Sequence, residues 1–131
     1  MSDIVDAARK YIGVPFIHQG RSMEGMDCVG LLVQVAEDLG YEAHDFTAYS
    51  LRPQAKELIR LIGKSCDRVK GDPRPGDIMV FAMIGPHWPQ HAAIKTKRGM
   101  IHAFKGGPNK VLEVSFDDFW QEKLHSVWRY R

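Results

Sequence analysis

The sequence predicts an α+β fold in which N-terminal helices pack on an antiparallel β-sheet meander. In the first half of the chain, apolar residues recur at helical spacing, the best example being the set Leu31, Leu32, Val35, Ala36 and Leu39. From Asp72 onwards, short apolar runs of strand length alternate with turns rich in glycine and proline. Helices first and strands second is the order of an α+β protein, because an α/β protein alternates the two.

The composition is that of an ordinary globular protein. The 131 residues suffice for one domain over residues 1–131 with a substantial core, and 44% of them are hydrophobic. The net charge of +2 is too small to indicate nucleic acid or a membrane surface as a partner. Two cysteines are too few for a disulfide framework. The first residues lack the basic and apolar regions of a signal peptide, so we expect synthesis in the cytoplasm without export by a signal of its own.

A first helix is expected to begin at Ser2 or Asp3, either of which can cap it, and to end at Gly13. Residues 12–26 then form a loop rich in glycine. Ordering a loop of this length costs conformational entropy, so such loops are usually functional.

A second helix of about three turns follows Asp27, which is a good N-cap, and ends before Gly40, which is a natural C-terminal glycine. A third helix is expected from Pro53 to Gly63. Strands are expected at residues 78–84, 91–96, 100–104, 111–114 and 126–130, with a helical turn near 116–120. The first of these strands is apolar throughout, which predicts burial on both faces.

Cys28 lies in the first turn of the second helix, and that position makes it a candidate nucleophile. The first N–H groups of a helix have no intrahelical partner, and the helix dipole places partial positive charge there. Both effects favour a thiolate, which is the reactive form of cysteine. The alternative is a buried, unreactive cysteine, which is the commoner state of such residues.

His91 and His102 stand among small and apolar residues of two predicted strands. Their numbers differ by an odd number, so in a hairpin closed by a two-residue turn they share a face. A turn at Arg98-Gly99, the best dipeptide by composition, would stagger them by about four residues and prevent contact. A turn at Thr96-Lys97, or a loop over residues 95–98, places them opposite each other. We predict this second register because a histidine base needs an orienting group on its other ring nitrogen.

With that register the three residues have complementary roles. Cys28 is the nucleophile, His91 takes its proton and later donates it to the leaving amine, and His102 orients His91. N–H groups of the first helical turn are placed to stabilise the oxyanion. The chemical alternative is a zinc site on the same three side chains. The sequence lacks a close ligand pair such as His-Glu-x-x-His, so we expect no metal.

The motifs resemble those of the NlpC/P60 cysteine peptidases in order and spacing over nearly the whole chain. They are residues Tyr11–Phe16, Gly25–Leu31, Pro75–Ile78, His91–Ile94 and Ile101–Ala103. The Gly20-Arg21-Ser22 segment and the form Asp27-Cys28-Val29-Gly30-Leu31 look closer still to the phage branch of the family. That branch holds cell-wall peptidases encoded among the tail genes of phages and gene transfer agents.

The resemblance implies a small papain-like fold and a Cys-His-His triad at Cys28, His91 and His102. It implies hydrolysis of the amide between D-γ-glutamate and a diamino acid in peptidoglycan stem peptides, without a cofactor. The expected partners are a stem peptide and phage-like tail proteins, and the expected location is a phage-like tail or particle that acts on the cell wall.

Two positions depart from the family pattern. Phe16 stands where the family often has a tyrosine whose hydroxyl lies near the nucleophile, so that donor is missing. Val29 stands where the family commonly has serine. In relatives, that serine and the residue equivalent to Asp27 help to hold the free amine of a stem peptide. Because valine forms no hydrogen bond, a preference for a free L-Ala terminus does not carry over.

Further candidates for substrate contact are His18, Gln19, Arg21 and Trp88, together with Asp27, Phe16 and Val29. Arg21 is suited to read a carboxylate, although a surface arginine is the commoner case. His18 either lines the groove or is a solvated loop residue, and Trp88 either forms a groove wall or caps the core. We interpret Cys66 as a core residue, and His44 and His125 as structural residues.

The leading interpretation is a cysteine endopeptidase of peptidoglycan stem peptides associated with a phage-type tail. A second interpretation keeps the triad and changes the bond, as in an N-acetylmuramoyl-L-alanine amidase. A third is a tail-tip assembly protein that keeps the fold without turnover. The reactivity of Cys28 separates the third interpretation from the other two.

Overall fold

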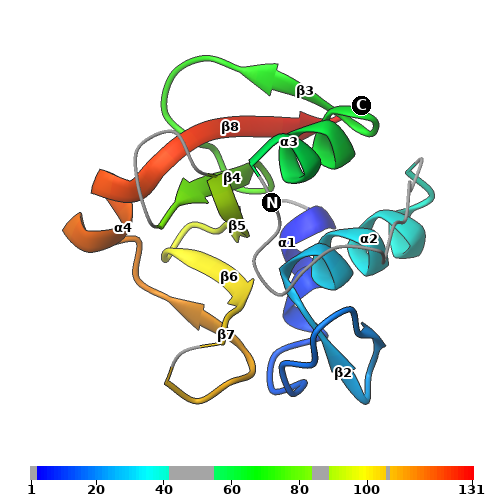
Figure 1. Cartoon of the computed structure of the whole chain (residues 1–131). Helices are drawn as coiled ribbons and strands as arrows, with labels where there is room; N and C mark the ends of the chain where they lie inside the picture. The colour runs from blue at the N-terminus through cyan, green and yellow to red at the C-terminus, as the bar shows by residue number, and fades with distance from the viewer. Residues whose placement is uncertain (1–2, 42–54, 84–88, 106) are drawn as a thin grey trace.

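The computed structural model describes residues 3–41, 55–83, 89–105 and 107–131 (Figure 1). The helices in this part are α1 (Asp3–Arg9), α2 (Cys28–Leu39), α3 (Ala55–Gly63) and α4 (Asp118–Lys123). The strands are β1 (Arg21–Ser22), β2 (Gly25–Met26), β3 (Cys66–Val69), β4 (Ile78–Ala82), β5 (Pro89–Lys95), β6 (Met100–Ala103), β7 (Val111–Val114) and β8 (Leu124–Tyr130). None of the helices in the described ranges is long and apolar enough to cross a membrane.

The sheet has the order β3-β8-β4-β5-β6-β7, and each neighbouring pair is antiparallel. Helices α1, α2 and α3 lie on one side of it and α4 lies on the other (Figure 1). The predicted α+β fold, with N-terminal helices on an antiparallel sheet, is therefore confirmed. The sequence did not predict β3, or the short β1–β2 hairpin inside the loop over residues 12–26.

Strand β4 divides the core into two clusters. Its residues Ile78 and Val80 face the helices and belong to the main cluster, while Met79 and Phe81 face α4 and belong to the second. All four side chains are almost fully buried. The prediction of a strand covered on both faces is confirmed, because alternate residues of a strand point to opposite sides.

Helix α2 begins and ends where the sequence predicted. Asp27 is extended, and its carboxylate accepts the N–H of Gly30, which leaves Cys28 as the first helical residue. Gly40 ends the helix in the left-handed conformation, with φ of 75°. Most of the helix is buried, so it is fixed by tertiary packing as well as by its caps.

The β5–β6 register is intermediate between the two that the sequence offered, and the predicted one is wrong. Ile94 pairs with Ile101 and Lys95 with Met100, so His102 is level with Ala93, two residues from His91. Thr96 and Gly99 close the turn through the Thr96 N–H, which donates to the Gly99 carbonyl, and the Gly99 N–H, which donates to the Thr96 hydroxyl. The same-face prediction for the two histidines survives, because an offset of two residues preserves the face.

Other helix and strand boundaries differ from the predicted ones by a few residues. The last strand begins at Leu124 instead of Ser126, and the helical turn near residues 116–120 is the capped helix α4. The expected start of the third helix at Pro53 lies outside the described residues. Its end at Gly63 is confirmed.

The C-terminal strand is fixed to the turn before β4 by an ion pair. Arg129 of β8 donates two hydrogen bonds to the buried carboxylate of Asp77, at 2.7 and 2.9 Å. Bidentate arginine–carboxylate pairs have a defined geometry. This pair therefore sets the position of β8 against β4, which leads into β5 and its histidine.

Candidate active site

Cys28 meets the sheet at the point where β5 and β6 separate. The β5–β6 ladder consists of the pairs Ile94–Ile101 and Lys95–Met100, so Ala92 lies beyond its end. The backbone N–H groups of Ala92 and Val29 hydrogen-bond to the Cys28 thiol. The N-terminal end of α2 thus places the Cys28 sulfur against Ala92 of β5, which follows His91 in the sequence.

The expectation of a lowered thiol pKa at Cys28 is not confirmed. Burial raises the pKa of the Cys28 thiol to about 12, and the neighbouring carboxylate of Asp27 acts in the same direction. The two N–H groups and the Arg21 guanidinium oppose this shift but are outweighed. Desolvation penalises the charged form of any group, and here it exceeds the benefit of the helix start. The resting cysteine is therefore a thiol.

His91 and His102 are in direct contact. His91 Nε2 lies 2.8 Å from His102 Nδ1, and both side chains are buried. Burial, followed by the proximity of His102, holds the pKa of His91 well below its usual value. Burial lowers the pKa of His102 to about 4. At neutral pH the pair is uncharged, so one ring donates and the other accepts.

The tautomer that suits catalysis follows from this contact. If His91 donates its Nε2–H to His102 Nδ1, then His91 Nδ1 carries a lone pair and can accept a proton. When His91 becomes charged, it keeps its Nε2–H and the same hydrogen bond. The prediction that His102 orients His91 thus has a geometry that supports it.

Three aromatic rings enclose the histidine pair, and the sequence analysis identified none of them. Phe104 stacks on His102, with centroids 5.2 Å apart and planes 8° apart. Trp120 of α4 contacts both imidazoles, and Phe81 of β4 contacts His91. Phe104 could have been identified from the sequence, because it lies two residues after His102 and alternate residues of a strand share a face. Trp120 could not, because α4 reaches the sheet from a distant part of the chain.

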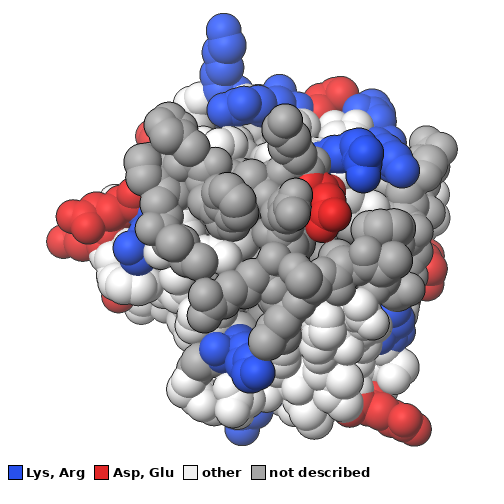
Figure 2. Space-filling view, in the orientation of Figure 1, with Lys and Arg blue, Asp and Glu red and all other residues white. Residues whose placement is uncertain are grey.

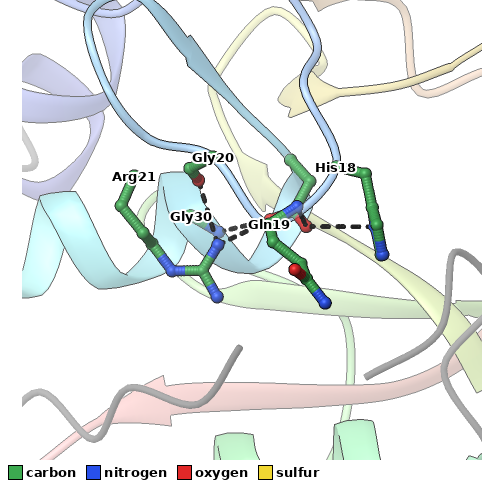
Figure 3. Close-up of polar contacts among 6 residues, drawn as sticks. His18, Gln19, Gly20, Arg21 and Gly30 are labelled. Atoms are coloured by element: carbon green, nitrogen blue, oxygen red, sulfur yellow. Dashed lines mark hydrogen bonds and ion pairs between the residues drawn. The ribbon is translucent and has the colours of Figure 1, made fainter. Parts of the chain in front are cut away.

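Asp27 is the centre of a second polar cluster, at the start of α2. Figure 3 shows its neighbours His18, Gln19, Gly20, Arg21 and Gly30. Its Oδ1 accepts the N–H of Gly30 at 2.8 Å and Nη1 of Arg21 at 3.2 Å. Its Oδ2 accepts the backbone N–H of Gln19 at 2.8 Å, and His18 Nδ1 lies 4.0 Å away. The carboxylate therefore joins the loop over residues 12–26 to the helix that carries Cys28.

Close backbone packing supports this cluster. A Cβ on Gly30 would lie 2.1 Å from the carbonyl oxygen of Gly20, which is closer than any real Cβ contact. The same Gly20 oxygen accepts Nη1 of Arg21 at 2.9 Å. Gln19 adopts φ of 64°, which is uncommon for a residue other than glycine. The structure thus brings together four of the predicted substrate residues, namely His18, Gln19, Arg21 and Asp27.

The other predicted substrate residues are not part of this cluster. Val29 is buried in the main core, and Phe16 is partly buried against that core. Trp88 lies outside the described residues, as does His44. Cys66 is buried in the main core, which confirms its interpretation as a core residue. His125 contacts the hydroxyl of Ser126 on β8.

Gln90, directly before His91, has a buried side-chain oxygen without a hydrogen-bond partner among the described residues. Nothing in the sequence pointed to it. Within the same residues, no group of three or more His, Cys, Asp or Glu side chains is arranged to hold a metal ion. This finding includes the trio of Cys28, His91 and His102 on which the zinc alternative depended.

The described charged side chains on the face seen in Figure 2 are of both signs and are spread around its margin. They do not gather into one large patch of a single sign on that face. This distribution agrees with the small net charge of +2. A polyanion-binding surface of clustered lysines and arginines is not seen there.

The comparison with known proteins identifies one family. A profile of the NlpC/P60 family matches residues 13–129. The gamma-DL-glutamyl hydrolase of Bacillus subtilis (strain 168) is 26% identical over 129 residues. This match covers 97% of the chain but only 29% of that relative, so the chain spans less than a third of its length.

Solved structures of this family share the fold. NlpC2 from Trichomonas vaginalis superposes with a TM-score of 0.76 at 20% identity, over 97% of this chain and 45% of that one. An NlpC/P60 family protein from Bacillus cereus ATCC 10987 gives 0.71 at 22% identity, over 98% and 39%. The NlpC/p60 domain of the peptidoglycan hydrolase SagA gives 0.64 at 24% identity, over 97% of each chain.

Proposed function

The chain belongs to the NlpC/P60 family, and on that premise we propose that it is a cysteine endopeptidase of peptidoglycan stem peptides. The observation that carries the proposal is the 2.8 Å contact between His91 Nε2 and His102 Nδ1, next to a cysteine held against Ala92. A nucleophile, a base and an orienting group in this arrangement are the parts of a catalytic triad. Cys28, His91 and His102 would fill these three roles.

The reaction begins from an uncharged cysteine and an uncharged histidine. As Cys28 Sγ attacks the carbonyl carbon of the substrate amide, its proton passes to His91 Nδ1. The resulting imidazolium donates its Nε2–H to His102, which stays neutral because its pKa is about 4. The raised pKa of the thiol means that proton transfer accompanies the attack and does not precede it.

The oxyanion of the tetrahedral intermediate forms beside the start of α2. The N–H groups of Val29 and Ala92, which face the Cys28 sulfur in the resting protein, are the nearest donors for it. Collapse breaks the C–N bond, and His91 gives its proton to the leaving amine. Water then attacks the thioester, with His91 as the base, and releases the carboxylic acid and the thiol.

The proposed bond is the amide between D-γ-glutamate and a diamino acid. The name of the Bacillus subtilis relative, a gamma-DL-glutamyl hydrolase, favours a γ-glutamyl bond over the N-acetylmuramoyl-L-alanine bond of the amidase alternative. Among the predicted substrate residues, His18 and Gln19 are half-buried and adjoin the start of the cysteine helix. We therefore assign them to substrate contact, with Arg21 and Asp27 holding the loop that presents them.

Association with a phage-like tail is the finer part of the proposal. It rests on the resemblance of Gly20–Ser22 and Asp27–Leu31 to the phage branch of the family. In that setting the tail delivers the enzyme to the cell wall. A tail-tip protein without turnover is the alternative. It is favoured by the raised pKa of the Cys28 thiol and by the residues Phe16 and Val29.

Digestion of purified sacculi tests the proposal, with mass spectrometry of the released fragments. The wild type and Cys28→Ala are compared, and Cys66→Ala is the matched control because Cys66 is the other cysteine and is also buried. We expect fragments that end at D-γ-glutamate from the wild type and Cys66→Ala, and none from Cys28→Ala. A different cut that is lost in Cys28→Ala indicates an amidase. No cleavage by any of the three proteins supports the assembly role.

A further inference from the structure

The side of the sheet opposite the cysteine helix contributes a residue to the candidate site. Helix α4 connects β7 to β8 on that side, away from α1 and α2 (Figure 1). Trp120 is the buried residue of α4, and it belongs to the second core cluster with Met79 and Phe81. Asp117 caps the helix by accepting the backbone N–H of Trp120 at 3.3 Å. The cap therefore holds the residue whose ring reaches the histidines.

Trp120 contacts both imidazoles at once. Its ring is perpendicular to that of His102, with centroids 5.2 Å apart and planes at 89°. It is tilted against His91, at 5.8 Å and 39°. Phe104 contacts the same rings, with its centroid 5.4 Å from that of Trp120 and 5.0 Å from that of His91. Contacts of this kind favour particular ring orientations, because aromatic rings interact edge to face or in offset stacks.

These rings provide apolar surface and no strong hydrogen-bond acceptor. The imidazole nitrogens that face each other therefore have each other as partners at 2.8 Å, without competition from the surrounding rings. Water that entered this space would compete for the same nitrogens and weaken the preference for one tautomer. Close packing of these rings buries the histidine pair, which favours its uncharged form and a single arrangement.

Charged groups near the enclosure are directed elsewhere. On β5, the Lys95 ammonium lies 6.0 Å from the centre of the Phe116 ring. On α4, Lys123 lies over Phe119, and Asp118 and Glu122 are exposed. On β7, Glu113 binds Arg9 and Thr96. On α2, the titratable group that faces β5 is the thiol of Cys28. On β8, His125 contacts the hydroxyl of Ser126.

We propose that Trp120 is a positioning residue, which packs against both imidazoles and holds His91 with Nε2 toward His102 and Nδ1 free for the thiol proton. This inference rests on the proposed function, in which His91 is the base. It assigns to α4 a role in catalysis that requires no contact with the substrate. Trp120 fixes the orientation of the His91 ring by packing against it, whereas His102 fixes it by a hydrogen bond.

The test compares Trp120→Leu, Trp120→Phe and the control Phe119→Leu. Phe119 is the adjacent aromatic residue of α4, is 53% exposed and packs edge-on against the Trp120 ring, at 5.1 Å. Its replacement removes an aromatic ring from the same helix and leaves Trp120 itself in place. Nitrogen-detected NMR follows the tautomers and titration of His91 and His102 in each protein. Steady-state kinetics on a γ-glutamyl peptide gives kcat, KM and their pH dependence.

We expect Trp120→Leu to lower kcat by about 10- to 100-fold with little change in KM, since small misplacements of catalytic groups have effects of this size. Its histidines should titrate at higher pH and populate mixed tautomers, and the acidic limb of the rate profile should move in the same direction. Trp120→Phe should change kcat and the histidine titration in the same directions, but by smaller amounts. Phe119→Leu should have a kcat within about twofold of the wild-type value, because it does not displace the catalytic groups.

Unchanged tautomers, titration and kcat in a folded Trp120→Leu would overturn the inference. If that variant does not fold, the same measurements on Trp120→Phe decide, because it keeps an aromatic ring in the second core. If the wild type lacks activity, the proposed function fails, while the NMR comparison still decides the positioning role by itself.

Discussion

His91 and His102 are joined through their ring nitrogens at 2.8 Å, although they lie two residues out of register on neighbouring strands. A diagonal pair on an antiparallel sheet is farther apart at the backbone than a directly opposed pair, so long or aromatic side chains are needed to bridge it. Imidazole rings meet this requirement. In the proposed mechanism, this contact makes His102 the orienting group for His91, the base, whose pKa is held low by burial.

Replacing His102 tests its orienting role. His102→Leu removes the acceptor for His91 Nε2, so the His91 ring can turn and both of its tautomers become populated. We expect kcat/KM on a γ-glutamyl peptide to fall by roughly 100-fold. His102→Gln keeps an acceptor oxygen and should lose less. Equal activity of the leucine variant and the wild type would exclude the orienting role.

The low histidine pKa values predict that the fold loses stability in acid. His102 has a pKa of about 4 in the folded protein, against a model-peptide value of 6.5. As the pH falls below 6.5, the unfolded chain takes up a proton that the folded protein does not, so the free energy of unfolding decreases until about pH 4. The decrease in the free energy of unfolding that His102 causes over this range is about 3 kcal/mol, and His91 adds a further decrease.

Chemical denaturation between pH 4 and pH 8 measures this loss. His102→Gln should make the dependence on pH less steep, because it removes one of the two groups responsible. His125→Gln is the control, since His125 lies on β8 outside the pair. The same slope in the wild type and in His102→Gln would contradict the burial-lowered pKa.

The pH dependence of alkylation tests the state of the thiol. In a Cys66→Ala background, iodoacetamide should react slowly with Cys28 at pH 7, and the rate should rise about tenfold per pH unit, since the pKa is about 12 and the thiolate is the reactive form. Cys28→Ala reports Cys66 in the same way. A rate that is already maximal below pH 8 would mean that cysteine and histidine form an ion pair before substrate binds.

Gly30 tests the contact between the loop and the cysteine helix. Alanine is usually more stable than glycine within a helix by about 1 kcal/mol. Gly30→Ala should instead destabilise the protein by about 1–3 kcal/mol, because its Cβ would overlap the Gly20 carbonyl. Gly63→Ala is the matched control at the end of α3, where the nearest atom to a new Cβ is 3.8 Å away. Thermal unfolding should move in opposite directions for the two, and a stabilised Gly30→Ala would refute the close approach.

Local signals in the sequence were sufficient for the cysteine helix. Asp27 and Gly40 are residue types whose own chemistry fixes a helix start and a helix end, and both lie where they were expected. The apolar run over β4 likewise determined its burial. Such features need no knowledge of the rest of the fold, which is why they were predicted correctly.

The predicted β5–β6 register was wrong because it assumed that His91 and His102 must be directly opposed in order to touch. Gly99, which had pointed to another register, is constrained by a different contact. By composition it suggested a turn glycine. In the structure, a Cβ on Gly99 would lie 2.0 Å from the Val114 carbonyl oxygen, so glycine is required where β7 crosses closely. A constraint imposed by a strand farther along the chain is invisible in the local sequence.

The state of Cys28 depended on the tertiary structure for the same reason. The helix start favours a thiolate, but the extent of burial, which raises its pKa, is a property of the assembled core. The contact of Trp120 with the two histidines also depended on tertiary packing. Sequence reasoning thus located the chemical groups, and their protonation states came from the fold.

The position of β8 has a consequence for when the proposed activity arises during synthesis of the chain. It is the last described strand along the chain, yet it lies between β3 and β4 in the sheet. Until β8 has left the ribosome, β4 has an open edge and β3 has no strand to pair with, so the sheet that carries both histidines is incomplete. Under the proposed function, a nascent chain that already contains Cys28, His91 and His102 is not yet a hydrolase, and the cell that makes it is protected until β8 has left the ribosome and joined the sheet.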